Sequence, residues 1–411
     1  MDNNKFCGTI IFMILLFASL CAHPTFKLGI ENIDDAIWLY LHNKKPAVGI
    51  ITNQTGTDQQ GTHSIDLLLQ RGVMLKRIFA PEHGLHGTVH AENEVLDAVH
   101  GGTNIPVVSL YGKGTGKKLD AHTISDLDLL IFDIQDSGMR HYTYISTLLH
   151  CMKAAAAHNK AFIVLDRPNP LGARTEGPIS DKHSTSFIAA APIALRHGMT
   201  IGELARYFNN HILEKKVRLH VVKLQNYVRS AGLPGNLLAP LSPNIISKQA
   251  CFGYSFLGLL GEVRPFDIGL GTDKAMRCLA LPERIPFAQN QWKQLQLQLK
   301  TFNVDSKPHR YFSARKKQNY RGLLFDIQDI NAAGSFDVVL TILKFFHDAK
   351  IGLEFADVFD VAIGTSKVQD YIKGKISRKD LMSEINADLV QFYNQTQGSY
   401  LYHPFPHLPS V

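Results

Sequence analysis

The sequence predicts an α/β protein: a Rossmann-like parallel sheet domain followed by a smaller mixed α+β auxiliary domain. Two observations support this class. Short apolar segments, each ending in polar or turn-forming residues, recur in the first half at 47–52, 75–80, 105–110, 127–132 and 161–165. Segments with helical spacing of apolar residues stand between some of them. Apolar strands that alternate with helices are typical of a parallel sheet covered on both faces.

The elements of the first half follow one another in a regular order. A strand at 47–52 (AVGIIT) precedes a helix at 64–70 (SIDLLLQ). Strands at 75–80, 105–110 and 127–132 come next, and a helix over 144–158 leads to the strand at 161–165. Thr200 and Glu203 form a Thr-x-x-Glu capping box, which predicts the start of a further helix. We also expect a strand at 219–224.

The second half predicts a different architecture. After residue 230 the chain becomes rich in glycine and proline, and the alternation of strands and helices weakens. We expect a strand at 323–330, an amphipathic helix at 336–349 and a further helix at 377–393. These observations predict a sheet domain over residues 23–246 and an auxiliary domain over 247–411.

Composition excludes several classes of protein. A chain of 411 residues with 45% hydrophobic and 19% charged residues is globular rather than disordered or fibrous. Five cysteines are too few for a disulfide framework. The net charge of +7 is modest, and we expect no concentrated basic patch. Nucleic-acid binding is therefore not expected.

The first 22 residues are typical of a secretory signal peptide. Lys5 precedes an apolar run at 7–20, and small residues follow near a plausible cleavage point. This run is shorter than the ~20 residues that a membrane span needs, so no stable span is expected. We expect a periplasmic or secreted protein. Lipid anchoring at Cys21 is less expected, because Leu20 stands where a lipoprotein signal prefers a small residue.

Polar side chains follow the predicted strands at the point where each strand ends. In open α/β sheets, ligands bind beyond the carboxyl ends of the strands, so these residues mark the expected site. They include, in chain order, Asn53, Glu82, His83, Asp133, Asp136, Asp166, Arg167 and Asn169.

Three chemistries compete for this site. Paired carboxylates drawn from Glu82, Glu94, Asp133, Asp136 and Asp166 could hydrolyse a glycoside. His83, His86 and His90, with carboxylates close behind, could hold a catalytic metal, although their Gly-rich loop lacks helical register. The third is phosphate or dinucleotide binding at the glycine-rich stretch 112–116, which lacks the G-x-G-x-x-G order and the Lys-Ser/Thr ending of a phosphate-binding loop. The chain has no G-x-S-x-G elbow.

Seven collinear motifs carry a family resemblance. They are GIITNQTG (49–56), FAPEHGLHG (79–87), PVVSLYG (106–112), FDIQDSGMRHYTYISTL (132–148), LDRPNPLG (165–172), EGP (176–178) and RHGMTIGELA (196–205). With these motifs the chain resembles the NamZ-type exo-β-N-acetylmuramidases. The resemblance implies a Rossmann-like catalytic domain whose cleft faces the auxiliary domain. It also implies release of N-acetylmuramic acid from the non-reducing ends of peptidoglycan fragments during cell-wall turnover.

The resemblance also implies site residues and partners. The catalytic carboxylates would be Glu82, Glu94, Asp133 and Asp136, with Glu82 as the general acid. The residues that bind a muramyl saccharide would be Asn53, His83, Arg140, Tyr142, Asp166, Arg167, Asn169, Arg196 and His197. Within this set, Arg140, Arg167, Arg196 and His197 are candidates to pair the lactyl carboxylate of the sugar. No metal or cofactor is implied, and the oligomeric state is left open.

The sequence departs from the family pattern at three places. Asn93 replaces a glycine, His141 stands where an aromatic residue is usual, and residues 260–266 differ from the usual loop. These departures leave a second alternative beside the metal-dependent hydrolase, namely a non-catalytic protein that binds wall fragments in the same cleft.

Overall fold

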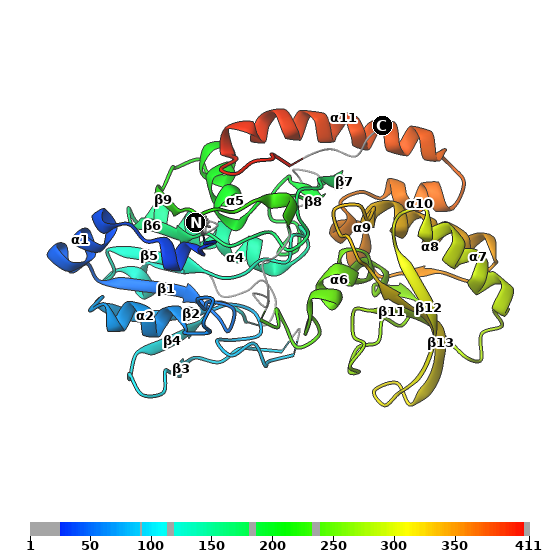
Figure 1. Ribbon diagram of the computed structural model, residues 1–411, viewed down its shortest axis with the longest axis horizontal. Coiled ribbons are helices and arrows are strands. Elements are labelled where there is room, and N and C mark those ends of the chain that lie inside the picture. Colours follow the sequence, from blue (N-terminus) through cyan, green and yellow to red (C-terminus); the bar gives the residue numbers. More distant parts are fainter. Residues whose placement is uncertain (1–24, 91–92, 113–118, 181–185, 232–238, 407–411) are drawn as a thin grey trace, which may run out of the picture.

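The protein has two domains side by side. The computed structural model describes residues 25–90, 93–112, 119–180, 186–231 and 239–406. In Figure 1 the sheet domain lies on the left and a smaller domain on the right. The signal peptide expected at 1–22 lies outside the described residues, as does most of the glycine-rich stretch 112–116. Within the described part, no helix is long and apolar enough to cross a membrane.

The sheet domain is built on a single large, mostly parallel sheet. Its strand order is β3-β4-β2-β1-β5-β6-β9, and only the β3–β4 pair is antiparallel. Ranked along the chain, the parallel strands have the order 3-2-1-4-5-6, which is that of a Rossmann fold. The order reverses between β1 and β5, so the ligand site of such a fold is expected at their carboxyl ends. The predicted fold class is confirmed.

The elements of this domain match the apolar segments closely. Its strands are β1 (Val48–Thr52), β2 (Leu75–Ala80), β3 (Ala98–Val99), β4 (Pro106–Ser109), β5 (Leu129–Asp133), β6 (Ala161–Leu165), β7 (Glu176–Ile179), β8 (Ala194–Arg196) and β9 (Arg218–Val222). Its α-helices are α1 (Asp35–Lys44), α2 (Ser64–Gln70), α3 (Ala121–Ile124), α4 (Thr143–Ala157) and α5 (Ile201–Tyr207). The capping box predicted at Thr200 and Glu203 is present at the start of α5.

Alternate residues of the central strands enter two separate cores. On β1, Ile50 packs into the core that contains α2, whereas Ile51 packs into the core that contains α4. On β5, Ile131 and Phe132 divide in the same way. Because successive side chains of a strand point to opposite faces, this division shows that both faces of the sheet are covered. Because both faces of β1 and β5 are buried, nearly all of their residues are apolar.

The second domain centres on a three-stranded antiparallel sheet. Its strands are β10 (Val263–Arg264), β11 (Cys278–Pro282), β12 (Asp305–Ser313), β13 (Gln318–Asp326) and β14 (Glu354–Phe355), and β11-β13-β12 form the sheet. Its helices are α6 (Lys248–Leu260), α7 (Gln289–Lys300), α8 (Ser335–Asp348), α9 (Val358–Ile363), α10 (Lys367–Ile372) and α11 (Arg378–Thr396).

The strand predicted at 323–330 is displaced in the structure, where β13 spans 318–326. The ladder ends because the backbone of Ile327 pairs with a side chain instead of a strand. Gln249 of α6 donates to the Ile327 carbonyl and accepts from its N–H, at 2.9 and 3.1 Å. Pairing with the polar strand β12 extends β13 at its other end.

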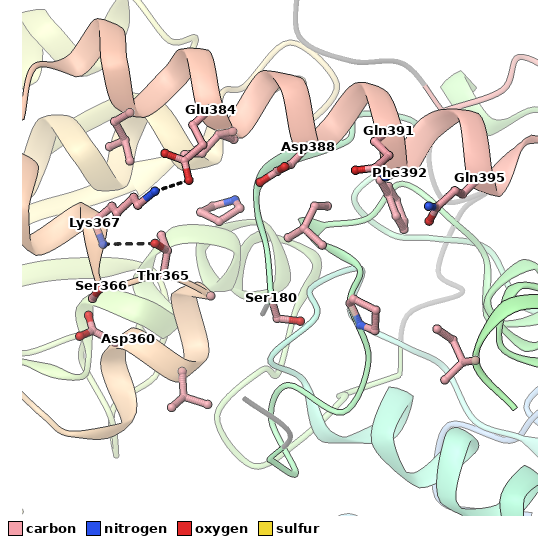
Figure 2. Close-up of a pocket in the computed structure, with 18 of the residues that line it drawn as sticks. Ser180, Asp360, Thr365, Ser366, Lys367, Glu384, Asp388, Gln391, Phe392 and Gln395 are labelled. Atoms are coloured by element: carbon pink, nitrogen blue, oxygen red, sulfur yellow. Dashed lines mark hydrogen bonds and ion pairs between the residues drawn. The ribbon is translucent and has the colours of Figure 1, made fainter. Parts of the chain in front are cut away.

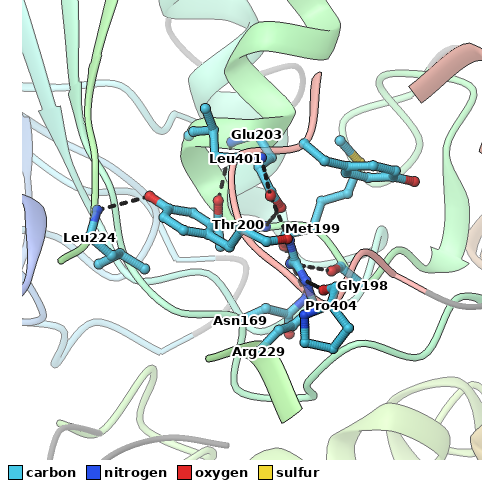
Figure 3. Close-up of polar contacts among 12 residues, drawn as sticks. Asn169, Gly198, Met199, Thr200, Glu203, Leu224, Arg229, Leu401 and Pro404 are labelled. Atoms are coloured by element: carbon cyan, nitrogen blue, oxygen red, sulfur yellow. Dashed lines mark hydrogen bonds and ion pairs between the residues drawn. The ribbon is translucent and has the colours of Figure 1, made fainter. Parts of the chain in front are cut away.

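The end of the chain returns to the sheet domain. Helix α11 runs along the top of both domains in Figure 1, and the residues after it pack beside α5 and β9. Leu401 N–H donates to the buried Glu203 carboxylate, and Arg229 donates to the Pro404 carbonyl (Figure 3). The division at residues 246 and 247 stays a prediction, but the tail at 401–404 is part of the packing of the first domain.

We expect Tyr402→Phe to lower the free energy of unfolding by about 1–3 kcal/mol. The Tyr402 hydroxyl donates to Asp166 Oδ2 at 2.6 Å and accepts from Leu224 N–H at 2.8 Å. The variant would leave the Leu224 N–H buried without a partner and remove a hydrogen bond from the carboxylate. Urea denaturation measures the change. Tyr393→Phe on α11 is the control, and an equal loss there would contradict a specific role for Tyr402.

Candidate active site

The loops that follow β1 and β5 are joined at the point where the strand order reverses. Thr52 Oγ1 donates to the Asp133 carbonyl at 2.9 Å. Asn53 Oδ1 accepts from the backbone N–H and the hydroxyl of Thr55, at 3.0 and 2.6 Å. The same hydroxyl accepts from Gln135 N–H at 2.9 Å. The two strand ends are therefore held rigidly, as a binding site requires.

Asp133 and Arg167 form a buried ion pair at this edge. Arg167 Nε lies 2.6 Å from Asp133 Oδ1, and its Nη2 lies 3.0 Å from Oδ2, so both carboxylate oxygens are taken. The side chains are 0% and 4% exposed. Arg167 Nη2 also donates to the Thr57 carbonyl. The pair ties β5 to the loop after β6.

Glu82 is a nearly buried carboxylate at this edge of the sheet, and only one of its oxygens is held by the fold. It follows β2, is 8% exposed, and its Oε2 accepts from Thr143 Oγ1 at 2.6 Å. Thr143 is the first residue of α4, so a helix start holds one oxygen in place. No described residue makes a hydrogen bond to Oε1. One oxygen is thus fixed and the other is left for a ligand.

The loop after Glu82 has a tightly determined backbone. His83 has a φ of +68°, which is uncommon for a residue with a Cβ. Its Nδ1 lies 2.7 Å from the Val89 carbonyl, so Nδ1 carries the proton and Nε2 is left as an acceptor. Gly87 has a φ of +66°, and a Cβ there would lie 2.2 Å from the Gln54 side chain. A left-handed backbone at a residue with a Cβ, as at His83, is common at functional sites.

Three tyrosines lie beside Glu82. Tyr142 and Tyr144 come from the start of α4, and Tyr254 comes from α6 of the second domain. The Tyr142 ring centre lies 4.7 Å from that of Tyr144 and 5.7 Å from that of Tyr254. Burial, followed by the charge of Glu82, raises the pKa of Tyr254 well above its usual value. Both domains therefore contribute to the surroundings of Glu82.

Several buried polar atoms near these rings have no hydrogen-bond partner among the described residues. They are Asn53 Nδ2, Gln54 Oε1, Asp136 Oδ1 and both ring nitrogens of His141. Buried polar atoms without a partner are rare in folded proteins, because each costs about 1–3 kcal/mol. Unpartnered polar atoms that lie together near the Glu82 carboxylate are typical of a site that binds a polar ligand.

A separate cavity of about 800 Å³ lies beneath α11, between α11, the start of α10 and β7 (Figure 2). Glu384, Asp388, Gln391 and Gln395 of α11 line one side, and Lys367 pairs with Glu384 across it. None of the residues expected at the strand ends lines this cavity. The convergence of Glu82 with the unpartnered atoms therefore marks the better candidate for the active site.

Family models match almost the whole described chain. The model described as exo-beta-N-acetylmuramidase NamZ, N-terminal, matches residues 48–249, and the C-terminal model matches residues 252–402. The chain belongs to the NamZ family. The family expected from the sequence motifs is thereby confirmed.

Named relatives and solved structures agree with this membership. The peptidoglycan beta-N-acetylmuramidase NamZ of Bacillus subtilis (strain 168) is 32% identical over 386 residues, which cover 92% of this chain and 91% of that protein. Crystal structures of two DUF1343 family proteins from Bacteroides fragilis cover 92% of this chain and 99% of theirs. Their identities are 31% and 24%, with TM-scores of 0.78 and 0.72. The expected enzyme class, a glycoside hydrolase, is confirmed by this relationship.

In this NamZ-family chain, two of the arginines expected at the site are held by contacts within the fold. Arg140 is buried and donates to the carbonyls of Pro178, Ile193 and Ala362 at 2.6–2.9 Å. Arg196 is buried, pairs with Glu176 at 2.9 Å and also donates to backbone carbonyls. These contacts occupy the Nη atoms of both guanidinium groups, whereas each buried Nε has no hydrogen-bond partner among the described residues, so substrate binding by Arg140 and Arg196 stays a prediction. Arg167 is likewise occupied by Asp133.

Three further expected residues are bound within the fold. The Asp166 carboxylate accepts from Thr200 and Tyr402, and burial raises its pKa to about 7. Asn169 donates to one backbone group and accepts from another. His197 is fully buried; its Nδ1 accepts from a backbone N–H, so Nε2 donates to Asp136 Oδ2 at 3.2 Å. These side chains are held by hydrogen bonds within the fold, and their direct contact with the sugar stays a prediction.

Of the remaining expected residues, one lies near Glu82 and the others are exposed. Tyr142 is close to Glu82, but its hydroxyl already donates to the Leu241 carbonyl at 2.8 Å. Glu94 is exposed, and no hydrogen bond or ion pair with a described residue places it beside Glu82. His86 and His90 are also exposed, and the described residues contain no group of three or more side chains that could hold a metal ion. The geometry therefore gives no support to the histidine metal site.

Because His141 is buried, the free energy of unfolding should fall at acidic pH. We expect His141→Phe to remove this pH dependence. Burial, followed by the charge of Arg140, lowers the pKa of His141 to about 3. Between pH 6.5 and 3 the unfolded chain binds a proton at this position and the folded protein does not, so stability falls as the pH falls. At pH 5 this costs about 2 kcal/mol relative to neutral pH.

Urea denaturation of both proteins at pH 7.5 and pH 5 measures this effect. The variant should lose about 2 kcal/mol less than the native protein over that interval. Parallel losses in the two proteins would contradict the assignment of the cost to His141.

Proposed function

We propose that this protein is an exo-β-N-acetylmuramidase that releases N-acetylmuramic acid from the non-reducing ends of peptidoglycan fragments. Membership of the NamZ family and the name of the Bacillus subtilis relative support this proposal. The structural observation that carries it is Glu82, a nearly buried carboxylate whose Oε2 is fixed by Thr143 and whose Oε1 makes no hydrogen bond with a described residue.

Glu82 acts as the general acid on the glycosidic oxygen. The Thr143 hydroxyl donates to Oε2, so the proton of the neutral acid resides on Oε1, the atom that the fold leaves for a ligand. Glu82 is 8% exposed and the Tyr144 hydroxyl donates to its backbone carbonyl at 3.4 Å, so the carboxyl group lies where little water reaches it. As the glycosidic bond breaks, Oε1 gives its proton to the departing sugar oxygen.

Asp136 is the second carboxylate of the proposed mechanism. Gly138 N–H and His197 hold its Oδ2 at 2.6 and 3.2 Å, which leaves the buried Oδ1 as an acceptor without a partner. Oδ1 can accept a hydrogen bond from an attacking water or from the acetamido N–H of the sugar. Asp133 cannot serve in this way because Arg167 occupies both of its oxygens.

Two further residues are placed to bind the sugar. Asn53 Nδ2 is a buried donor that has no partner in the described part of the chain, which suits a sugar or lactyl oxygen. His83 Nε2 is an acceptor that suits a sugar hydroxyl, since Nδ1 is held by the Val89 carbonyl. These two groups are neutral, unlike the arginine fork expected from the sequence.

The proposal includes export and a role in cell-wall turnover. The apolar run and small residues of the first 22 positions support a signal peptide. Cell fractionation with an antibody against the native protein tests this point. Recovery in the periplasm or medium is the expected result, and recovery in the cytoplasm alone would contradict it.

A product assay on two isomeric disaccharides tests the activity. We expect free N-acetylmuramic acid from a disaccharide with this sugar at its non-reducing end, and no cleavage when N-acetylglucosamine occupies that end. Activity should survive exhaustive chelation. Loss of activity on chelation would instead support a metal-dependent hydrolase, and saturable binding without product would support a non-catalytic binding protein.

A further inference from the structure

The hairpin formed by β12 and β13 concentrates the positive charge of the protein. Residues 307–321, here called the basic hairpin, carry no acidic residue and six basic ones: Lys307, Arg310, Arg315, Lys316, Lys317 and Arg321. The whole chain has a net charge of +7. This cluster departs from the expectation of no concentrated basic patch: Arg315, Lys316 and Lys317 are consecutive, and strand pairing places Arg310 opposite Arg321.

The pairing within the basic hairpin is unfavourable for an isolated sheet. Arg310 and Arg321 lie directly opposite one another across the two strands. Like charges at such positions destabilise a sheet. Glu283 lies 3.8 Å from Arg310, and Asp267 lies 2.8 Å from Lys316, but these two contacts leave most of the charge uncompensated. An anionic partner would relieve this repulsion.

An exposed aromatic residue lies on the same strand face as basic side chains of the hairpin. Phe312 is 59% exposed and lies on the same face of β12 as Arg310, two residues away. At the turn, Arg315 and Lys317 are exposed and form no ion pair with a described residue. An aromatic ring among lysines and arginines is typical of proteins that rest on a membrane surface.

We propose that the basic hairpin docks the protein on the surface of an anionic lipid bilayer. The lysines and arginines would contact lipid phosphates, and Phe312 would enter the headgroup region. The hairpin extends from the lower side of the second domain in Figure 1, so it presents a projecting edge to a flat surface. The residues named around Glu82 lie outside the hairpin.

Sedimentation with lipid vesicles tests the proposal. The native protein should bind vesicles of phosphatidylcholine with 30% phosphatidylglycerol at about 50 mM salt and release at high salt, with little binding to pure phosphatidylcholine. Arg315→Gln with Lys317→Gln should weaken binding about 30-fold, since each basic residue near an anionic membrane contributes about fivefold. Lys153→Gln with Lys293→Gln makes the same change in net charge at exposed helix positions and should bind like the native protein.

A fluorescent variant distinguishes insertion from simple charge attraction. Phe312→Trp should shift its emission to shorter wavelength with the anionic vesicles and not with dextran sulfate. The Arg315→Gln with Lys317→Gln variant and the Phe312→Trp variant should keep native thermal stability and full activity on a soluble disaccharide. Equal binding to neutral vesicles, or an equal loss in the Lys153 and Lys293 control, would overturn the proposal. Tighter binding to peptidoglycan sacculi through Arg315 and Lys317 would also overturn it, in favour of a wall-binding surface.

Discussion

Glu82→Gln should lower kcat on a muramyl disaccharide by about 10²–10⁴-fold, the usual contribution of a general acid. The amide keeps the shape of the side chain and can still contact Thr143 Oγ1, but it has no proton to give to the leaving oxygen. Folding should be preserved. Steady-state kinetics with a defined disaccharide, together with a thermal melt of the variant, measure both expectations.

Glu94→Gln is the matched control for this experiment. The family resemblance suggested Glu94 as a second catalytic carboxylate, but its side chain is exposed in the loop after β2. We expect less than about a threefold change in kcat from this variant, because exposed substitutions away from a site have small effects. A loss as large as that of Glu82→Gln would contradict the assignment of the acid to Glu82 alone.

Arg167→Met should lower the free energy of unfolding by about 3–5 kcal/mol. The substitution leaves the fully buried Asp133 carboxylate without its partner, and the cost of an unpaired buried charge exceeds that of the lost contact. Chemical denaturation measures the change. Because the pair joins β5 to the loop after β6, we expect the loss in global stability and not only in local mobility.

A second substitution separates the charge from the packing. Asp133→Asn with Arg167→Met removes the unpaired charge and should recover part of the stability lost in the single variant. Arg77→Met is the comparison at a partly exposed pair, where Asp126 is the partner. Its cost should stay within about 1 kcal/mol. A double variant no more stable than Arg167→Met would contradict the explanation by buried charge.

The sequence was most informative where burial leaves a continuous apolar pattern. β1, β5 and β6 are apolar along nearly their whole length because both faces of the sheet are covered, and they were found within about two residues. The hairpin strand β12 was missed, because it is short of apolar residues and only its pairing with β13 makes it a strand. Local patterns do not show pairing partners.

Only part of the candidate site could be predicted from the sequence, because contacts with distant parts of the chain leave no local pattern. The rule that ligands bind beyond strand ends led to Asn53, Glu82 and Asp136, whose unpartnered atoms support it. It did not reveal that Arg196 is held by Glu176 and by carbonyls around residues 330–333, because these partners come from a distant part of the chain. Tyr254 was also missed, since its apolar helix α6 resembles any core helix in sequence.

The dependence of the Glu82→Gln defect on the leaving group tests the central claim most directly. An aryl muramide with a strongly acidic phenol needs no proton from the enzyme to depart, whereas a disaccharide does. If Glu82 is the general acid, the variant should keep nearly native kcat/KM on the aryl substrate while losing about 10²–10⁴-fold in kcat/KM on the disaccharide. Equal losses on the two substrates would contradict this role and would point to Glu82 acting on the sugar rather than on the leaving group.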